Sequence, residues 1–294
     1  MGVYVAYFGS IRIIASILLP LVSSVSLYGI FISTTNGRVR SWSLGLMFLS
    51  SIFLWLFVAA SLVLCYAFAE AYEYELEAVI SAVFGRAVLI SIASGLPLSL
   101  LLRYFSPRVL LRKAKGLSVP GAEVSTSFGR LVQKMNLTSA ELKLSKIDVP
   151  ISFAVETKVP IVVMSESLLS LLNKDEAEAV MAHELAHIKN SDTTLKAVAT
   201  AYRTALPHDP IIRLVEAAFH REREMVADET AVKITMKPLS LASALLKIYE
   251  AFPRSNLASY GTLSILGAAS TLMSRHPPIL HRINRLIHLA ETYS

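Results

Sequence analysis

The sequence is poor in cysteine and in charged residues. Its 294 residues include a single cysteine, Cys65, so the chain can form no internal disulfide and cannot build a cysteine-based zinc site. Charged residues make up 17% of the chain, whereas a soluble domain carries about 25%. Intrinsic disorder is excluded as well, because 54% of the residues are hydrophobic and disordered chains are poor in apolar side chains. The composition predicts a protein that is partly embedded in lipid.

The missing charge is concentrated in the N-terminal third. Residues 13–33 and 44–69 contain no charged side chain, and each run is long enough for a helix to cross the hydrocarbon, which takes about 20 residues. A third span is expected over residues 80–102, with Arg86 near one interface. The alternative for this third segment is a buried or interfacial helix. We therefore expect a transmembrane region over residues 1–115, which includes a basic juxtamembrane segment, and a second domain over residues 116–294.

Lysine and arginine beside the spans predict the orientation. Arg38 and Arg40 lie between the first two spans, and a cluster of basic residues follows the third, whereas the loop at residues 70–79 carries only glutamates. Because basic loops stay in the cytoplasm, we expect a multi-pass protein of the cell membrane with its N-terminus outside and its C-terminal domain in the cytoplasm. Membrane lipid is an expected partner. No interleaved basic and aromatic motif indicates nucleic-acid binding.

The C-terminal domain is predicted to begin with a helix and a small sheet and to continue as helices. Ser165 is expected to start a short helix, Asn173 and Glu176 to form a capping box, and Asp209 to cap the helix that begins at Pro210. The strands are predicted at residues 141–149, 151–155 and 160–164. The main helices are predicted at residues 122–135, 174–190, 193–205, 210–235, 239–251, 259–273 and 277–292.

One of these helices carries His183, Glu184 and His187 in the pattern H-E-x-x-H. Residues four positions apart lie on one face of a helix, about 6 Å apart along its axis, so both imidazoles can bind one ion. Glu184 flanks that ion, where a general base for a zinc-activated water is expected. The alternative is a solvated helix face with two histidines. Because the chain has only seven histidines, the pattern favours a zinc site.

A catalytic zinc ion usually has three protein ligands and one open position. The predicted helix at residues 210–235 offers Glu224 as the third ligand. Four residues later, Asp228 would accept a hydrogen bond from the second nitrogen of a ligating histidine. Two alternatives remain open: Glu224 could belong to a charged helix face, and His220, one turn earlier, could compete as a ligand.

Several short motifs between residues 152 and 282 occur together with H-E-x-x-H. They are Ser152-Phe153-Ala154, the strand at 160–164, Ile188-Lys189-Asn190, Arg221-x-x-Glu224-x-x-Ala227-Asp228, and His276-Pro277-Pro278 with Arg282. In these motifs the chain resembles the HtpX heat-shock protease and CAAX prenyl protease family of integral-membrane zinc metalloendopeptidases, the gluzincins. Unlike in better-known bacterial members, residues 191–219 hold too many charges to span lipid.

The resemblance implies roles for seven residues. One zinc ion per chain is bound by His183, His187 and Glu224. Glu184 is the catalytic base, and Asp228 supports a ligating histidine. His276 and Arg282 are catalytic residues of the substrate cleft, where either would stabilise the oxyanion.

The expected fold class is α+β and mostly helical, with an N-terminal three-helix transmembrane bundle and a zincin-like metallopeptidase domain that has a small β-sheet. The expected function is zinc-dependent hydrolysis of peptide bonds in polypeptide substrates, in membrane-protein quality control. The strand at residues 160–164 could hold such a substrate in extended form at a sheet edge. Two alternatives are a signal-relay metallopeptidase that cuts one dedicated partner, as β-lactam-sensor antirepressor proteins do, and a non-catalytic zinc-binding scaffold. The sequence does not indicate an oligomeric state.

Overall fold

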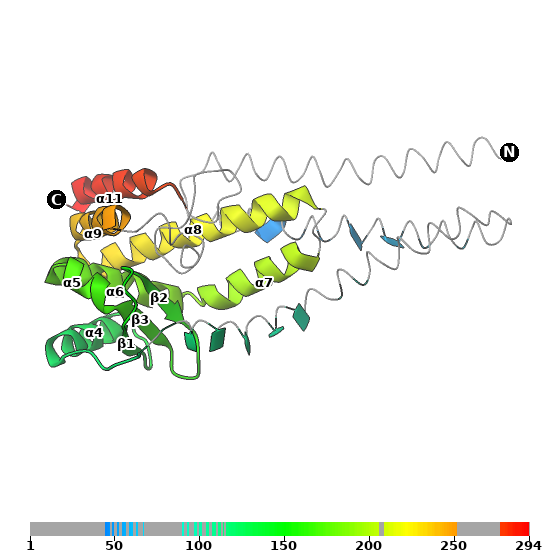
Figure 1. The fold of residues 1–294 in the computed structure, drawn as a ribbon. Helices are drawn as coiled ribbons and strands as arrows, with labels where there is room; N and C mark the ends of the chain where they lie inside the picture. The colour runs from blue at the N-terminus through cyan, green and yellow to red at the C-terminus, as the bar shows by residue number, and fades with distance from the viewer. Residues whose placement is uncertain are drawn as a thin grey trace. The chain divides into compact units, whose positions relative to one another are not determined.

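The computed structural model describes residues 116–205, 209–251 and 277–293 continuously, and scattered positions between residues 45 and 114 (Figure 1). The predicted span at 13–33 and the predicted helix at 259–273 lie outside the described residues, and the other two predicted spans are described only at isolated positions. Among the described residues, no helix combines the length and the apolar character that crossing a membrane requires. The predicted domain boundary at residue 115 therefore stays a prediction.

The chain divides into two compact units. The first consists of residues Met1–Leu101 and Val198–Phe219, and the second of residues Leu102–Ala197 and His220–Ser294. The second unit contains the sheet and all the described residues of the candidate site. It is mostly helical with one small sheet, which confirms the α+β class predicted for this part of the chain.

The sheet has three strands, close to where the sequence predicts them. They are β1 (Glu141–Ser145), β2 (Ser152–Val155) and β3 (Ile161–Ser165), in the order β1-β3-β2. β1 runs parallel to β3 and β2 runs antiparallel to it, with Val163 opposite both Lys143 and Phe153. The prediction that residues 160–164 form a substrate-binding edge was wrong, because β3 is paired on both sides. β2 is an edge strand instead, and no described strand pairs with its other side.

Helix α6 (Lys174–Lys189) is the central element of this unit and packs against β2, β3, α4 (Ala122–Lys134) and α9 (Pro238–Ala251). Its buried face consists largely of alanine, valine and leucine, which allow close approach of the neighbouring elements. The core around it combines apolar residues of the sheet with residues of the helices, among them Phe128, Leu131, Val163, Leu185 and Leu245.

The start of α6 is fixed by the predicted capping box, which the structure confirms. The Asn173 side chain accepts a hydrogen bond from the backbone N–H of Glu176, and the Glu176 carboxylate accepts one from the backbone N–H of Asn173. The same carboxylate also accepts hydrogen bonds from Ser243 at 2.7 Å and Lys247 at 2.8 Å, both on α9. Glu176 therefore joins the start of α6 to α9.

The remaining described helices are α5 (Glu166–Leu171), α7 (Asp192–Ala205), α8 (Pro210–Thr235) and α11 (Ile279–Tyr293). The predicted caps are present: Ser165 caps α5, and Asp209 accepts hydrogen bonds from the backbone N–H groups of Ile211 and Ile212 at the start of α8. α11 packs against α9.

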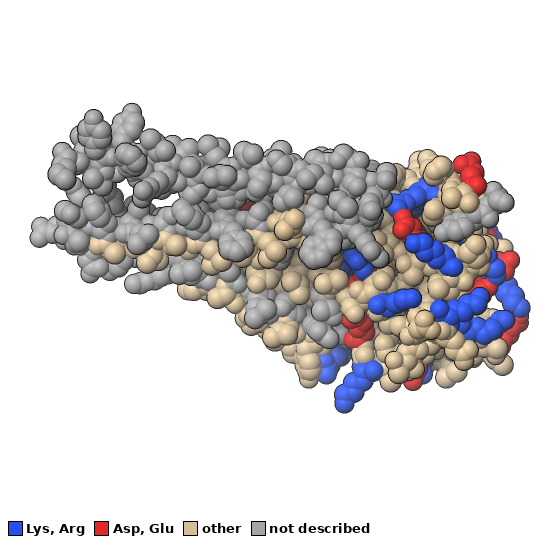
Figure 2. Space-filling model, turned by 180° about the vertical axis from the view of Figure 1, so that it is seen from behind, with Lys and Arg blue, Asp and Glu red and all other residues tan. Residues whose placement is uncertain are grey.

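On the face shown in Figure 2, basic and acidic side chains are mixed over the described surface, whereas the carboxylates of the site are buried.

Candidate metal centre

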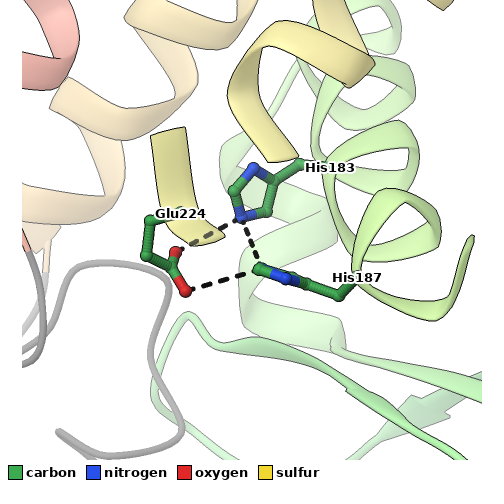
Figure 3. Close-up of side chains that lie close together, drawn as sticks. All are labelled: His183, His187 and Glu224. Atoms are coloured by element: carbon green, nitrogen blue, oxygen red, sulfur yellow. Dashed lines mark hydrogen bonds and ion pairs between the residues drawn. The ribbon is translucent and has the colours of Figure 1, made fainter. Parts of the chain in front are cut away.

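Two helices bring together three side chains of the kinds that can bind a metal ion. His183 and His187 extend from α6, and Glu224 extends toward them from α8 (Figure 3). The Nε2 atoms of the two histidines are 3.2 Å apart. The Glu224 oxygens Oε2 and Oε1 lie 3.6 Å from His183 Nε2 and 3.5 Å from His187 Nε2. His183, His187 and Glu224 form a compact group of potential metal ligands.

The spacing of these atoms fits a small divalent ion. In a tetrahedral zinc site with bonds of about 2.0–2.1 Å, neighbouring ligand atoms lie roughly 3.3–3.4 Å apart, and the three distances here are 3.2, 3.5 and 3.6 Å. The donor set of two imidazoles and one carboxylate is one that catalytic zinc uses. The cluster is therefore compatible with a metal ion that keeps a fourth position for water or substrate.

Behind His183 lies Asp228, as the spacing on the predicted helix suggests. His183 Nδ1 is 2.9 Å from Asp228 Oδ1, so the other ring nitrogen, Nε2, faces the metal position. Arg282 of α11 donates to both oxygens of Asp228, from Nε at 2.7 Å and from Nη2 at 2.6 Å. The Arg282 side chain is 1% exposed, and its Nη1 lies 3.7 Å from Glu224 Oε2. Arg282 is thus placed to fix Asp228 and Glu224 inside the protein.

The ionisation of His183 reflects these neighbours. Burial lowers the pKa of His183, but the carboxylates of Asp228 and Glu224 outweigh burial and raise it to about 9. For Asp228, burial raises the pKa, and the charges of Arg282 and His183 with their hydrogen bonds reverse the effect, so that the pKa is lowered. The two carboxylates therefore favour a positive charge at the ring of His183.

Behind His187 lies a carboxylate that the sequence reasoning missed. His187 Nδ1 is 2.7 Å from Oδ2 of Asp192, the first residue of α7. Asp192 is 1% exposed, and Arg223 of α8 donates to its Oδ1. The available signal was an aspartate five residues after His187, two residues beyond the predicted end of the helix, and an arginine directly before Glu224.

Glu184 points to a different neighbour from those of the histidines. Its Oε1 accepts a 2.6 Å hydrogen bond from the hydroxyl of Ser152, the first residue of β2. Both side chains are buried. Ser152 belongs to one of the motifs noted in the sequence, but its contact with Glu184 depends on how the sheet packs on α6 and could not be inferred from the motif alone.

One further cation lies at the cluster. Lys196 Nζ donates to Glu224 Oε1 at 3.0 Å, and 24% of the lysine side chain is exposed. Of the two ligand alternatives left open by the sequence, the charged-face interpretation of Glu224 does not fit its burial, and His220 is not a member of the described ligand group. His276 lies outside the described residues.

Comparison with known proteins places this arrangement in a family. The family model described as "BlaR1 peptidase M56" matches residues 105–276, more than half of the chain. A protein named "Protease HtpX homolog" from Thermococcus kodakarensis is 31% identical over 206 residues, which are 55% of this chain and 71% of that protein. The chain belongs to the HtpX-type family of membrane metalloproteases.

Other HtpX homologues agree with this assignment. The homologue from Methanopyrus kandleri is 36% identical over 45% of this chain and 53% of that protein, so this match spans about half of the relative. The homologue from Gemmatimonas aurantiaca is 28% identical over 70% of this chain and 90% of that protein. The crystal structure of S. mikatae Ste24p covers 95% of this chain and 98% of its own with a TM-score of 0.45 and 12% identity, a likeness too weak to define the fold.

Proposed function

We propose that this chain is a membrane-anchored, zinc-dependent endopeptidase that hydrolyses peptide bonds of unfolded polypeptides, as membrane-protein quality control requires. The observation that carries the proposal is the group formed by His183, His187 and Glu224, whose donor-atom spacing is compatible with a metal ion such as zinc. One zinc ion per chain, held by these three side chains, would supply a Lewis acid that lowers the pKa of a water molecule and polarises the scissile carbonyl.

Glu184 is assigned the proton transfers. Because Glu184 directly follows the proposed ligand His183 on α6, we expect its carboxylate to flank the metal position. Its Oε1 is held by Ser152, and we assign Oε2 to accept a proton from the attacking water and to pass it to the leaving amine. Ser152 acts as a positioning residue that restricts the rotation of this carboxylate.

The substrate is assigned to the edge strand β2. An extended peptide can add a strand to a sheet edge through main-chain hydrogen bonds, and β2 is an edge strand among the described residues. Ser152, at the start of β2, contacts the proposed base Glu184, so a peptide paired with β2 would run close to the reacting groups. This proposal replaces residues 160–164 as the docking strand.

The remaining two residues of the expected cleft are assigned different roles. Because Arg282 is buried and bonded to Asp228, we propose that it acts through Asp228 and Glu224 as a positioning residue. His276 is kept as the proposed group that stabilises the oxyanion in the substrate cleft.

For the membrane part, we propose the arrangement that the sequence predicts. Residues 1–115 would contain three spans, at about 13–33, 44–69 and 80–102, and the metallopeptidase domain would cover residues 116–294. The distribution of basic residues supports an outside N-terminus and a cytoplasmic catalytic domain, with lipid as a partner. Protease added to intact cells should then leave the C-terminal domain uncut.

The catalytic proposal is tested by metal content and cleavage together. The full chain is purified in detergent as wild type, His183→Ala and Glu184→Gln, its zinc is quantified, and cleavage of unfolded casein is followed. We expect one zinc per chain in the wild type and in Glu184→Gln, a strong loss of zinc in His183→Ala, and cleavage in the wild type alone. Cleavage by Glu184→Gln at the wild-type rate would refute the base assignment, and a metal-free active wild type would refute the whole proposal.

A signal-relay protease is the second candidate, which the match to the "BlaR1 peptidase M56" model favours. Such an enzyme cuts one dedicated partner and ignores most other chains. A library of unfolded soluble proteins separates the two candidates, since quality control predicts broad cleavage. Cleavage of very few members, with zinc bound and Glu184 required, would favour the relay.

A further inference from the structure

The structure holds His187 through a chain of charged groups that begins on α8. Arg223 donates from its guanidinium to Asp192 Oδ1, and Asp192 Oδ2 lies 2.7 Å from His187 Nδ1. Asp192 is buried, and the Arg223 side chain is 13% exposed. The three residues come from three helices: α8, the first position of α7, and α6.

We propose that Asp192 and Arg223 are positioning residues that form a clamp, which preorganises the metal site before the ion arrives. The clamp has two functions. Through Asp192 it fixes the ring of His187 so that Nε2 offers its lone pair to the metal. Through Arg223 it holds α8 beside α6, so that Glu224, the next residue, reaches the same point. This inference rests on the proposed metal site and adds to it the residues that set metal affinity.

The first function follows from the chemistry of the donor and the acceptor. An ionised carboxylate can only accept hydrogen bonds, so Nδ1 of His187 must carry the proton that faces Asp192. Nε2 is then the unprotonated nitrogen, which a metal ligand requires. Without Asp192 the ring could adopt the other tautomer or rotate away, and part of the free energy of metal binding would be spent on reorienting it.

The second function follows from the backbone. α6 ends at Lys189 and α7 begins at Asp192, and Ser191 between them has a φ of +52°, in the left-handed region that non-glycine residues seldom adopt. This short, strained joint leaves Asp192 little freedom to choose another partner. The chain thus places the carboxylate at a fixed distance from His187, and Arg223 binds to it there.

The opposing interpretation is an ordinary buried ion pair that stabilises the packing of α7 on α8 without influence on the metal. The two interpretations differ in what the loss of Asp192 changes. A structural pair affects only the stability of the fold, whereas the clamp also affects metal affinity and the geometry of the bound ion. Removal of a carboxylate behind a ligating histidine typically costs about 10–100-fold in metal affinity.

The test uses the full chain in detergent, freed of metal and reloaded. The variants are Asp192→Ala, Asp192→Asn and Arg223→Lys. The matched control is Glu176→Gln, which removes a buried charge on α6 that is paired with Lys247 and contacts none of the ligands. Three quantities are measured: zinc affinity by competition with a chromogenic chelator, the visible absorption of the cobalt-loaded protein, and the thermal unfolding midpoint of the metal-free protein.

We expect Asp192→Ala to bind zinc about 10–100-fold more weakly than the wild type and to show an altered cobalt spectrum. Asp192→Asn keeps an acceptor oxygen for His187 and should lose less zinc affinity than Asp192→Ala. Arg223→Lys keeps the positive charge but not the paired guanidinium donors, and it should also lose less zinc affinity than Asp192→Ala. Glu176→Gln should unfold at a lower temperature and bind zinc as the wild type does.

The clamp proposal would be overturned if Asp192→Ala had the same zinc affinity and the same cobalt spectrum as the wild type. If Asp192→Ala does not fold, wild-type values in both Asp192→Asn and Arg223→Lys would overturn it equally. Equal losses of affinity in Asp192→Ala and Glu176→Gln would also overturn it, because the effect would then be one of general stability. If the wild type itself binds no divalent ion, the proposed function fails. If the wild type binds zinc and the variants bind it equally well, only the clamp fails.

Discussion

Arg282 donates two hydrogen bonds, of 2.7 and 2.6 Å, to the two carboxylate oxygens of Asp228 in the interior of the protein. The arginine comes from α11 near the C-terminus and the aspartate from α8. Asp228 in turn lies 2.9 Å from the ring of His183. A residue that the sequence places in a substrate cleft thus lies behind the proposed metal site, with Asp228 between them.

This pair leads to the first prediction. Replacing Arg282 by methionine leaves the Asp228 carboxylate buried without its main partner, and breaking a buried ion pair in this way costs about 3–5 kcal/mol. The free energy of unfolding of metal-free Arg282→Met should fall by about that amount in chemical denaturation. The control is Arg285→Met on the same helix, whose pair with Glu229 is partly exposed and should be worth less than about 1 kcal/mol. Equal losses in the two variants would contradict the prediction.

The contact between Ser152 and Glu184 gives the second prediction. Ser152→Ala removes a hydrogen bond to a charged group, worth about 1.5–3 kcal/mol, so the proposed base Glu184 should be less well oriented in the transition state. We expect kcat to fall about tenfold or more while KM and zinc content stay near wild type. Ser167→Ala serves as control, because its hydroxyl bonds to the carbonyl of Ile147 and not to a site residue. An unchanged kcat in Ser152→Ala would remove the serine from the mechanism.

The third prediction concerns Lys196, whose ammonium group lies 3.0 Å from Oε1 of the proposed ligand Glu224. A positive charge at this point opposes the approach of a divalent cation. Lys196→Met should therefore bind zinc more tightly, by about tenfold, which corresponds to about 1.4 kcal/mol. Chelator competition measures the change. Lys247→Met, which loses a pair with Glu176 instead, should leave zinc affinity unchanged. A weaker affinity in Lys196→Met would show that the lysine orients the ligand.

The fourth prediction concerns the acid sensitivity of the fold. Burial raises the pKa of Glu176, but the hydrogen bonds from Lys247, the backbone of Asn173 and Ser243 outweigh it, so that the pKa is lowered from its ordinary value of 4.5. The folded state therefore favours the ionised form, and the stability that it provides is complete above about pH 4.5. This stability is lost as the pH falls through the lowered value.

Measured between pH 3 and 7, the unfolding free energy of the wild type should fall more steeply at the acid end than that of Glu176→Gln, which has no proton to gain. Lys237→Gln is a useful comparison, because it removes a surface pair with Asp175 and Glu178 and leaves Glu176 in place. It should keep the steep acid limb. Parallel curves for the wild type and Glu176→Gln would contradict the prediction.

The parts of the fold that depend on neighbouring residues were predictable from the sequence. The capping box at Asn173, the cap at Asp209 and the limits of α8 all follow from short patterns that act within one or two helical turns. The three strands were predicted for the same reason. Their order was not, because pairing of β3 with both β1 and β2 depends on contacts between residues far apart in the chain.

The candidate site divides in the same way. The H-E-x-x-H residues all lie on α6, and Glu224 and Asp228 both lie on α8. Because each pattern lies within a single helix, helix geometry is enough to predict which of its side chains share a face. Asp192 was missed because its position depends on the left-handed residue Ser191 between two helices. The hydrogen bonds from Arg282 to Asp228 depend on how α11 packs in the fold. No local sequence pattern predicts this packing.

The shortness of β2 has a consequence for what this enzyme would recognise. β2 is only four residues long, Ser152–Val155. A substrate segment paired with this edge strand would therefore form no more than a few main-chain hydrogen bonds. Such bonds are indifferent to side-chain identity, but they demand a stretch of backbone that is not already folded. The enzyme would then select substrates that have lost their folded structure, and the amino-acid sequence of the substrate would matter less.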